Sequence, residues 1–320
     1  AFLVRLAILY AWVLAYGYHR LGSAPPEQGR LRIALVQANI AQSDKWDEDL
    51  RGQNFARYMA MSDEEKGRIP NTFIIWPETA APVRIPWEKE IGASVRDTIA
   101  SIGRPVLVGT LDAVITGPNS YEDFNAAILF GPDGEIRQRY YKAHLVPFGE
   151  VTPWKSHVPL LTKLDFGQSE FTPGREGTIF EGPRGSRLRV LICFESIFGE
   201  IARQGVRDGA GYLVNITNDF WFGRSAGPVQ HAEMAILRAV ENRTPLLRCA
   251  NSGISFFVDP AGRVSGETDL FTYALPTAEI TAGRGGSVFT RHGEVWMRWL
   301  VGAALLFAVL ALWPKRVLGR

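Results

Sequence analysis

Cysteine is scarce in this sequence, neither sign of charge is in excess, and no low-complexity tract or short-period repeat is present. The 2 cysteines are too few for a disulfide framework. Lysine and arginine number 35 and aspartate and glutamate 33, which gives a formal net charge of +2. Nucleic-acid binding requires a concentrated basic face, so we expect no nucleic-acid partner.

Long apolar runs occur only at the two ends of the chain. Residues 2–18 are almost all apolar, with one interruption at Arg5, and residues 295–313 are apolar apart from Arg298. Each run reaches the lower limit of about 17–20 residues for a helix that crosses a bilayer. Because the chain opens inside the first run and without methionine, we also expect it to be part of a longer protein.

The runs and the hydrophobic content of 46% together predict the domain organisation. The expected order is a transmembrane helix at 1–20, a linker at 21–30, a main domain at 31–290, and a transmembrane helix with a short basic tail at 291–320. Buried core helices are the alternative for both runs. A signal peptide is the alternative for the first, although Pro25 just after a cut at Ala24 makes a poor cleavage site.

The charges beside the runs bear on orientation. Lys315, Arg316 and Arg320 favour a cytoplasmic C-terminus and a main domain on the outer side of the membrane, and His19 and Arg20 argue mildly against it.

Between the ends, short β-branched segments bounded by Gly, Pro, Asn or Asp alternate with helical patterns. We expect strands at residues 31–38, 72–76, 105–110, 125–130, 188–193, 212–217, 246–250 and 254–259. We expect helices at residues 47–61, 87–102, 199–208 and 230–244. This alternation predicts an α/β layer architecture. The turn sequences FGPDGEI and VDPAGRV predict hairpins, so the sheets are not purely parallel.

Three strand exits carry side chains that suit acyl chemistry. Cys193 ends the expected strand in ICFES, and Glu78 follows another strand in IIWPET. Lys142 and Glu150 lie in YYKAHLVPFGE. Taken singly, these residues are explained as a core cysteine, a solvated carboxylate and a surface lysine. Because strand ends in open α/β sheets face the ligand crevice, their combination favours a site.

The chemistry of acyl transfer needs these three groups together. A thiol with an ordinary pKa of about 8.5 is mostly protonated at neutral pH, so a base must take its proton. A carboxylate serves as that base when burial raises its proton affinity. A fixed lysine and the backbone N–H after the nucleophile then stabilise the negative oxygen that develops on the acyl carbonyl.

These residues resemble the Glu-Lys-Cys triad of the nitrilase, or carbon-nitrogen hydrolase, superfamily. More narrowly, the chain resembles the C-terminal portion of the bacterial apolipoprotein N-acyltransferase family. The narrower likeness rests on VQANIAQSDKWDED, HLVPFGE, NDFWFGRSAGPVQH and RAVENRTPLLRCANSGIS, and on the two apolar ends. It extends over nearly the whole chain.

The resemblance implies a nitrilase-like four-layer α-β-β-α sandwich flanked by transmembrane helices. It implies an enzyme of the bacterial inner membrane whose catalytic domain, residues 31–290, faces the periplasm. The implied reaction moves a fatty acyl chain from a phospholipid to a cysteine thioester. The fatty acyl group is then transferred from the cysteine to the N-terminal amine of a diacylglyceryl-cysteine apolipoprotein. No cofactor and no metal are implied.

The resemblance also assigns roles residue by residue. Cys193 is expected to be the nucleophile, Glu78 the general base and Lys142 the stabiliser of the oxyanion. Glu150 matches the superfamily's second glutamate, which orients the lysine.

Four further residues are expected to support the site or bind substrate. Glu195 matches a position that supports the active-site loop, and Trp46 matches a tryptophan near the lipid entrance. An ordinary aromatic at a helix start explains Trp46 equally well. Phe194 stands where the family often has tyrosine. Its backbone N–H is available to the oxyanion, but it has no phenolic hydroxyl. Trp221 belongs to a set of loop aromatics that suggests either a lid for an acyl chain or a small core beneath the loops: Trp154, Phe166, Phe171, Phe220, Trp221 and Phe222.

Other polar residues have simpler interpretations. We expect His231 to pack or cap a helix, with contact to a substrate as the alternative. We expect Asn218 and Asp219 to form a turn, and Cys249 to be structural. In an oxidising compartment, a functional Cys193 must stay apart from Cys249.

Two other function classes remain open. A membrane-tethered amidase or nitrilase uses the same triad but releases the acyl group to water. A lipid-binding module with an inactive triad is the third class, and nothing in the sequence favours it.

Overall fold

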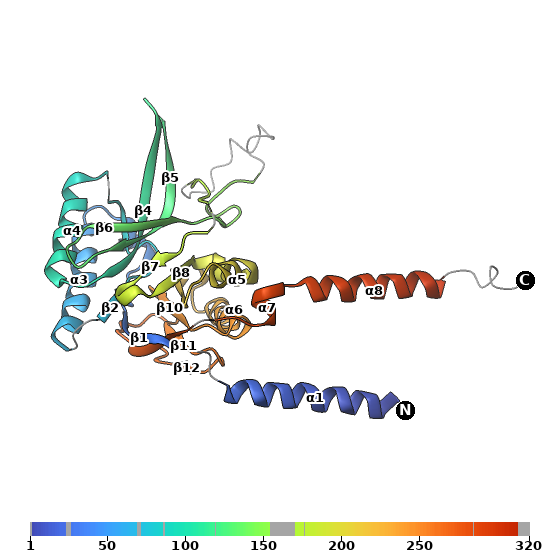
Figure 1. Cartoon of the computed structure of the whole chain (residues 1–320). Helices are drawn as coiled ribbons and strands as arrows, with labels where there is room; N and C mark the ends of the chain where they lie inside the picture. Colours follow the sequence, from blue (N-terminus) through green and yellow to red (C-terminus); the bar gives the residue numbers. More distant parts are fainter. Residues whose placement is uncertain are drawn as a thin grey trace, which may run out of the picture.

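The computed structural model of the chain (Figure 1) describes residues 2–23, 27–68, 72–85, 87–118, 120–153, 170–175, 177–283 and 285–312. The first of its two sheets contains β1 (Glu27–Leu35), β2 (Thr72–Ile75), β3 (Ala81–Arg84), β4 (Val106–Gly117), β5 (Ser120–Phe130), β6 (Ile136–Tyr141) and β13 (Thr277–Gly283). The strand order is β13-β1-β2-β4-β5-β6, with β3 beside β4. The pairs β1–β2 and β2–β4 are parallel, whereas β13, β5 and β6 run antiparallel to their neighbours.

The second sheet contains β7 (Phe180–Glu181), β8 (Arg187–Ile192), β9 (Tyr212–Thr217), β10 (Leu246–Ala250), β11 (Phe256–Val258) and β12 (Val264–Ser265). Its order is β12-β11-β10-β9-β8-β7, and its centre, β10-β9-β8, is parallel. The carboxyl ends of these parallel strands therefore meet at one edge, where ligand sites of α/β sheets form.

The helices are α1 (Phe2–Gly22), α2 (Gln42–Trp46), α3 (Arg51–Arg68), α4 (Lys89–Ile102), α5 (Gly199–Arg207), α6 (Gly227–Asn242), α7 (Val288–His292) and α8 (Val295–Leu312). Short 3-10 turns are η2 (Pro183–Gly185), η3 (Cys193–Ile197) and η4 (Asp219–Phe222). Helices α3 and α4 cover the first sheet, and α5 and α6 cover the second (Figure 1).

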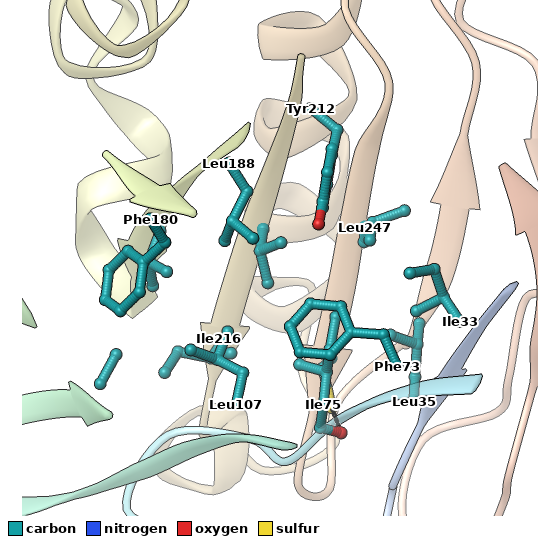
Figure 2. Close-up of a cluster of buried hydrophobic side chains, with 14 of the residues drawn as sticks. Ile33, Leu35, Phe73, Ile75, Leu107, Phe180, Leu188, Tyr212, Ile216 and Leu247 are labelled. Carbon is teal, nitrogen blue, oxygen red and sulfur yellow. Dashed lines mark hydrogen bonds between the residues drawn. The ribbon is translucent and has the colours of Figure 1, made fainter. Parts of the chain in front are cut away.

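Side chains from both sheets form one buried core between them (Figure 2). Phe73 and Ile75 of β2 share this core with Ile216 of β9, whereas Ile74 and Leu213 lie in the clusters under the outer helices. Strand side chains alternate between faces, so both faces of these central strands are buried. The predicted four-layer α-β-β-α arrangement is thus observed.

Several predicted boundaries need correction. The strand expected at 188–193 ends at Ile192, because Cys193 has a left-handed backbone with φ 48° that does not continue a strand. The helix expected at 47–61 begins at Arg51, after a turn in which the Asp47 side chain accepts a hydrogen bond from the N–H of Asp49 at 2.9 Å.

Other corrections concern strands. The strand expected at 254–259 is reduced to β11, and β1 begins inside the stretch expected as a linker. The two predicted turns do join β5 to β6 and β11 to β12. The strands β3, β7 and β13 were not predicted, because two are very short and β13 pairs with β1 from the far end of the chain.

The terminal helices α1 and α8 project from the sandwich on the same side, away from both sheets (Figure 1). Their apolar side chains are largely exposed, as at Trp12, Leu300 and Phe307. Within the described part of the chain, no helix reaches the combined length and hydropathy of a membrane span. The two transmembrane helices therefore remain predictions.

Candidate active site

A cavity of about 710 Å³ opens where strand ends of the two sheets converge. Its wall includes Glu78 after β2, Lys142 after β6 and Glu150 in the following loop. It also includes Cys193 after β8 and Asn218 after β9. The structure therefore brings together the four residues expected to carry the chemistry, although 115 positions separate Glu78 from Cys193 in the sequence.

Cys193 is held by an unusual backbone at the start of η3. Its φ of 48° places a non-glycine residue in the left-handed region, which costs of order 1 kcal/mol or more. The turn ends β8 abruptly and places Cys193 in the cavity wall. The next peptide N–H, that of Phe194, lies in the first turn of η3, where an N–H has no partner within the helix.

The two glutamates hold Lys142 between them. Lys142 Nζ lies 3.3 Å from Oε1 of Glu78 and 2.8 Å from the carboxylate of Glu150. The side-chain amide of Asn125 donates to both carboxylates, at 2.8 Å to Glu78 and 3.0 Å to Glu150. The second oxygen of Glu78 accepts the backbone N–H of Asn218 at 3.0 Å. Lys142 and Glu78 are therefore each held by more than one hydrogen bond or ion pair.

Burial and the neighbouring charges set the protonation states. Burial raises the pKa of the Cys193 thiol well above its ordinary value, and the charge of Glu78 raises it further, while Lys142 acts in the opposite direction. Burial alone would lower the pKa of Lys142, but Glu78, Cys193 and Glu150 outweigh it and raise the pKa. The resting site thus holds a neutral thiol and a charged lysine, and the thiol needs a base before it can attack.

Glu195 is completely buried beneath the nucleophile turn. Its Oε1 accepts the hydroxyl of Tyr140 at 2.7 Å and the N–H groups of Ala143 and His144 at 2.8 and 3.2 Å. Its Oε2 accepts the N–H of Ile192 at 2.8 Å. Glu195 therefore links the strand before Cys193 to the loop that follows Lys142.

The predicted aromatic residues line the cavity. Trp46 and Trp221 are 43% and 61% exposed and stand in its wall, so apolar side chains meet solvent at the site. Phe194 also lines it and packs edge-on against Phe198, with ring centres 5.1 Å apart. Of the remaining loop aromatics, Phe171 and Phe222 line the cavity.

Among the described members of that set, Phe220 is not in the wall. Phe220 packs on Phe271, and Trp154 and Phe166 lie outside the described residues.

Sequence reasoning missed a group of buried polar residues behind Cys193. Asp219 does more than form a turn, because its carboxylate binds His231 at 2.9 Å and Arg248 at 2.7 Å. His231 packs as expected, but it also lies 3.1 Å from the backbone oxygen of Cys193. These residues come from η4, α6 and β10, and no local pattern in the sequence links them.

Cys249 is free and buried in the core between the sheets. Its thiol lies 3.2 Å from the backbone oxygen of Ile75. Cys193 is also free, and no disulfide joins the two. Among the described residues, no group of His, Cys, Asp and Glu side chains is arranged to hold a metal ion.

A second buried lysine, Lys45, was also missed. It lies directly before Trp46 on α2, is 2% exposed, and donates to the backbone oxygen of Glu78 at 3.0 Å and the hydroxyl of Thr79 at 2.8 Å. Burial lowers the pKa of Lys45 to about 8, although Glu78 and Cys193 act in the opposite direction. Lys45 thus links the entrance helix to the loop that carries Glu78.

The lowered pKa of Lys45 predicts a stability change with pH. Between pH 8 and 10.5 the unfolded chain keeps the Lys45 proton and the folded chain loses it. The contribution of Lys45 to the free energy of unfolding therefore increases as pH rises. Between pH 8 and 10.5, we expect the unfolding free energy of the wild type to increase by roughly 3 kcal/mol relative to that of Lys45→Met. Denaturant unfolding of both proteins measures the difference. Lys89→Met on the exposed start of α4 is the control, and parallel curves for wild type and Lys45→Met would refute the assignment.

The chain is similar in sequence to known proteins over most of its length. The carbon-nitrogen hydrolase family model matches residues 32–288. The apolipoprotein N-acyltransferase of Geobacter metallireducens is 37% identical over 314 residues, which are 98% of this chain and 60% of that protein. The one from Chlorobaculum tepidum is 35% identical, with 90% and 58% covered. The chain thus spans about three fifths of the length of these relatives.

Solved structures share the fold at low identity. Nit3 of Saccharomyces cerevisiae, a member of the nitrilase superfamily, superposes with a TM-score of 0.60 at 20% identity, covering 81% of this chain and 93% of that one. An amidase from Nesterenkonia sp. gives 0.60 at 18% identity, with 84% and 96% covered. A variant of the Nesterenkonia sp. AN1 amidase carries the acetamide moiety of fluoroacetamide on its active-site cysteine.

Proposed function

Since the chain belongs to the carbon-nitrogen hydrolase family, we propose that it is the catalytic part of an N-acyltransferase that works through a thioester on Cys193. The acyl donor is a phospholipid, and the acceptor is the N-terminal amine of a diacylglyceryl-cysteine apolipoprotein. The observation that carries the proposal is the Glu78–Lys142–Glu150 cluster beside Cys193, in a cavity whose wall is rich in aromatic side chains. The similarity to apolipoprotein N-acyltransferases supports the choice of substrates.

In the first half-reaction, Glu78 takes the proton from the Cys193 thiol and the sulfur attacks the ester carbonyl of the phospholipid. The Lys142 ammonium and the Phe194 N–H stabilise the oxyanion that forms. The tetrahedral intermediate expels the lysophospholipid alkoxide, which takes the proton back from Glu78. The products are an acyl thioester on Cys193 and a free lysophospholipid.

In the second half-reaction, the acceptor amine attacks the thioester carbonyl and Glu78 takes the proton that the nitrogen releases. The C–S bond breaks, an amide forms, and the Cys193 sulfur recovers its proton from Glu78. The same base thus serves both steps, as in other double-displacement acyl transfers. Hydrogen bonds from Asn125 to Glu78 and from Lys142 to Glu150 hold the base and the lysine in position in both half-reactions.

The cavity suits one acyl chain. Its volume of about 710 Å³ lies in the range of small-molecule sites. Trp46, Phe171 and Trp221 in its wall offer apolar surface, and the charged groups gather around Cys193. An acyl chain placed here has its carbonyl at the polar end and its tail against aromatic rings.

The terminal helices support a location at the bacterial inner membrane, with the sandwich on the periplasmic side. Helices α1 and α8 leave the sandwich on one side (Figure 1). Both expose apolar side chains along their lengths. We propose that both enter the lipid, which would hold the catalytic domain beside its phospholipid donor. The basic tail that favours a cytoplasmic C-terminus lies outside the described residues.

The alternative is a membrane-tethered hydrolase that releases the acyl group to water, favoured by the structural likeness to amidases. To separate the two, the protein in detergent is incubated with acyl-labelled phosphatidylethanolamine and a synthetic diacylglyceryl-cysteine peptide. The proposal expects label in an amide of the peptide. Without the peptide, it expects a protein-bound thioester that persists. Rapid release of labelled fatty acid whether or not the peptide is present would establish hydrolysis instead.

A further inference from the structure

His231 lies in a closed polar network directly behind the nucleophile. Its Nδ1 is 2.9 Å from Oδ1 of Asp219, and its Nε2 is 3.1 Å from the backbone oxygen of Cys193. The ring is 6% exposed, and Asp219 is 1% exposed. The network is therefore largely shielded from solvent, and His231 also borders the cavity.

Each ring nitrogen of His231 has a hydrogen-bond acceptor as its partner, Asp219 at Nδ1 and the Cys193 oxygen at Nε2, and each also has a group that can donate, Arg248 at Nδ1 and Ser196 at Nε2. A carbonyl oxygen can only accept. Asp219 is also an acceptor: burial would raise the pKa of its carboxyl, but Arg248 and His231 outweigh burial and lower it to about 2. A ring that meets acceptors on both sides needs an N–H on both nitrogens, which only the imidazolium provides.

Each neutral form of the ring leaves a conflict. With a proton on Nε2 alone, the Nδ1 lone pair faces the Asp219 carboxylate at 2.9 Å. With a proton on Nδ1 alone, Nε2 faces the Cys193 oxygen, and the single hydroxyl proton of Ser196 must serve two acceptors. Ser196 Oγ is 3.0 Å from Nε2 and 2.9 Å from that oxygen. The remaining contact to the Cys193 oxygen, from the amide of Asn215, is long at 3.5 Å.

Two charged groups contact Nδ1 of His231: the carboxylate of Asp219 at 2.9 Å and Nη2 of Arg248 at 3.2 Å, whose charge opposes a positive ring. Asp219 lies between the two cations and binds both.

We propose that His231 is held as an imidazolium and strengthens the oxyanion site through the Cys193–Phe194 peptide. A hydrogen bond to the carbonyl of a peptide group polarises it and makes its N–H a stronger donor. Here the carbonyl belongs to Cys193 and the N–H is that of Phe194. His231 is thus a positioning residue, and the same contact fixes the left-handed turn at Cys193. This inference rests on the proposed function for the oxyanion, while the charge of the ring does not depend on it.

The first test reads the charge directly. Histidine-selective ¹⁵N labelling of the full chain and long-range ¹H–¹⁵N spectra at pH 7 report whether each ring nitrogen carries a proton. Five histidines contribute, and His231→Gln assigns the signal of interest. The proposal expects two protonated ring nitrogens for His231. A neutral-ring spectrum at that position would overturn it.

The second test uses the reactivity of Cys193 and needs no acyl substrate. Alkylation of Cys193 by iodoacetamide, followed by peptide mass spectrometry, is measured against pH. Loss of the nearby positive charge in His231→Gln is expected to move the profile up by roughly one pH unit. His292→Gln, on the exposed α7, is the control and leaves the profile unchanged. Coincident profiles for His231→Gln and wild type would overturn the proposal.

The third test measures acylation by labelled phospholipid. We expect the rate to fall about 10-fold in His231→Gln, which keeps an N–H donor, and about 10²-fold in His231→Ala, which keeps none. Thermal unfolding of both variants identifies any loss due to misfolding. If wild type forms no adduct, the proposed function fails, while the first two tests still decide the state of His231. Unchanged acylation in His231→Ala would contradict the role of the ring.

Discussion

Cys193→Ala is expected to abolish the acyl adduct completely, whereas Cys249→Ala retains it. Only Cys193 stands in the cavity wall beside Glu78 and Lys142, and Cys249 is buried in the core between the sheets. Alanine keeps the Cβ of residue 193 and adds no new backbone strain, so the fold should persist. Incubation with labelled phospholipid followed by intact-protein mass spectrometry measures the adduct.

Thermal unfolding provides the control for the two cysteine variants. Cys193→Ala should unfold close to the wild-type temperature, so that loss of the adduct reflects loss of the sulfur. Cys249→Ala removes a buried side chain and should be less stable while still forming the adduct. Equal labelling of both variants would show that the assignment of Cys193 as the nucleophile is wrong.

Lys142→Ala should slow acylation by about 10²–10³-fold, the loss typical of a missing oxyanion donor. It should also lower the unfolding free energy by about 3 kcal/mol, because it leaves Glu78 and Glu150 without their buried cation. Lys142 is 1% exposed, so solvent screens these contacts little.

Single-turnover acylation and denaturant unfolding measure the two effects of Lys142→Ala. Lys89→Ala is the matched control, because Lys89 is exposed on α4 and does not line the cavity. A Lys142→Ala protein that acylates at the wild-type rate would exclude this lysine from the chemistry, even if its stability fell as expected.

The sequence was informative where a side chain follows a buried strand. Glu78 and Cys193 each follow a run of apolar residues, and such strand ends converge at one edge of a sheet. The layers were also predictable, because the alternation of strands and helices is visible in the local sequence pattern of each segment. The turn at Cys193 was less predictable, because its φ of 48° depends on contacts from Ser196 and His231.

The sequence was silent where residues act through long-range contacts. Lys45 reads as an ordinary charged residue in SDKWDED, and its burial depends on the loop after β2, 33 positions away. Asp219 and Arg248 are 29 positions apart, and each alone suggests a turn or a surface charge. Their pairing arises only when β9 and β10 lie side by side, with Cys249 opposite Ile216.

The most direct measurement of the central claim is the position of the acyl group on the protein. The full chain is treated with acyl-labelled phospholipid, digested, and mapped by tandem mass spectrometry, with hydroxylamine to cleave thioesters. We predict the label on the peptide that contains Cys193, bound through sulfur, and its disappearance when the diacylglyceryl peptide is added. Label that resists hydroxylamine, or that maps to any other residue, would contradict the proposed mechanism.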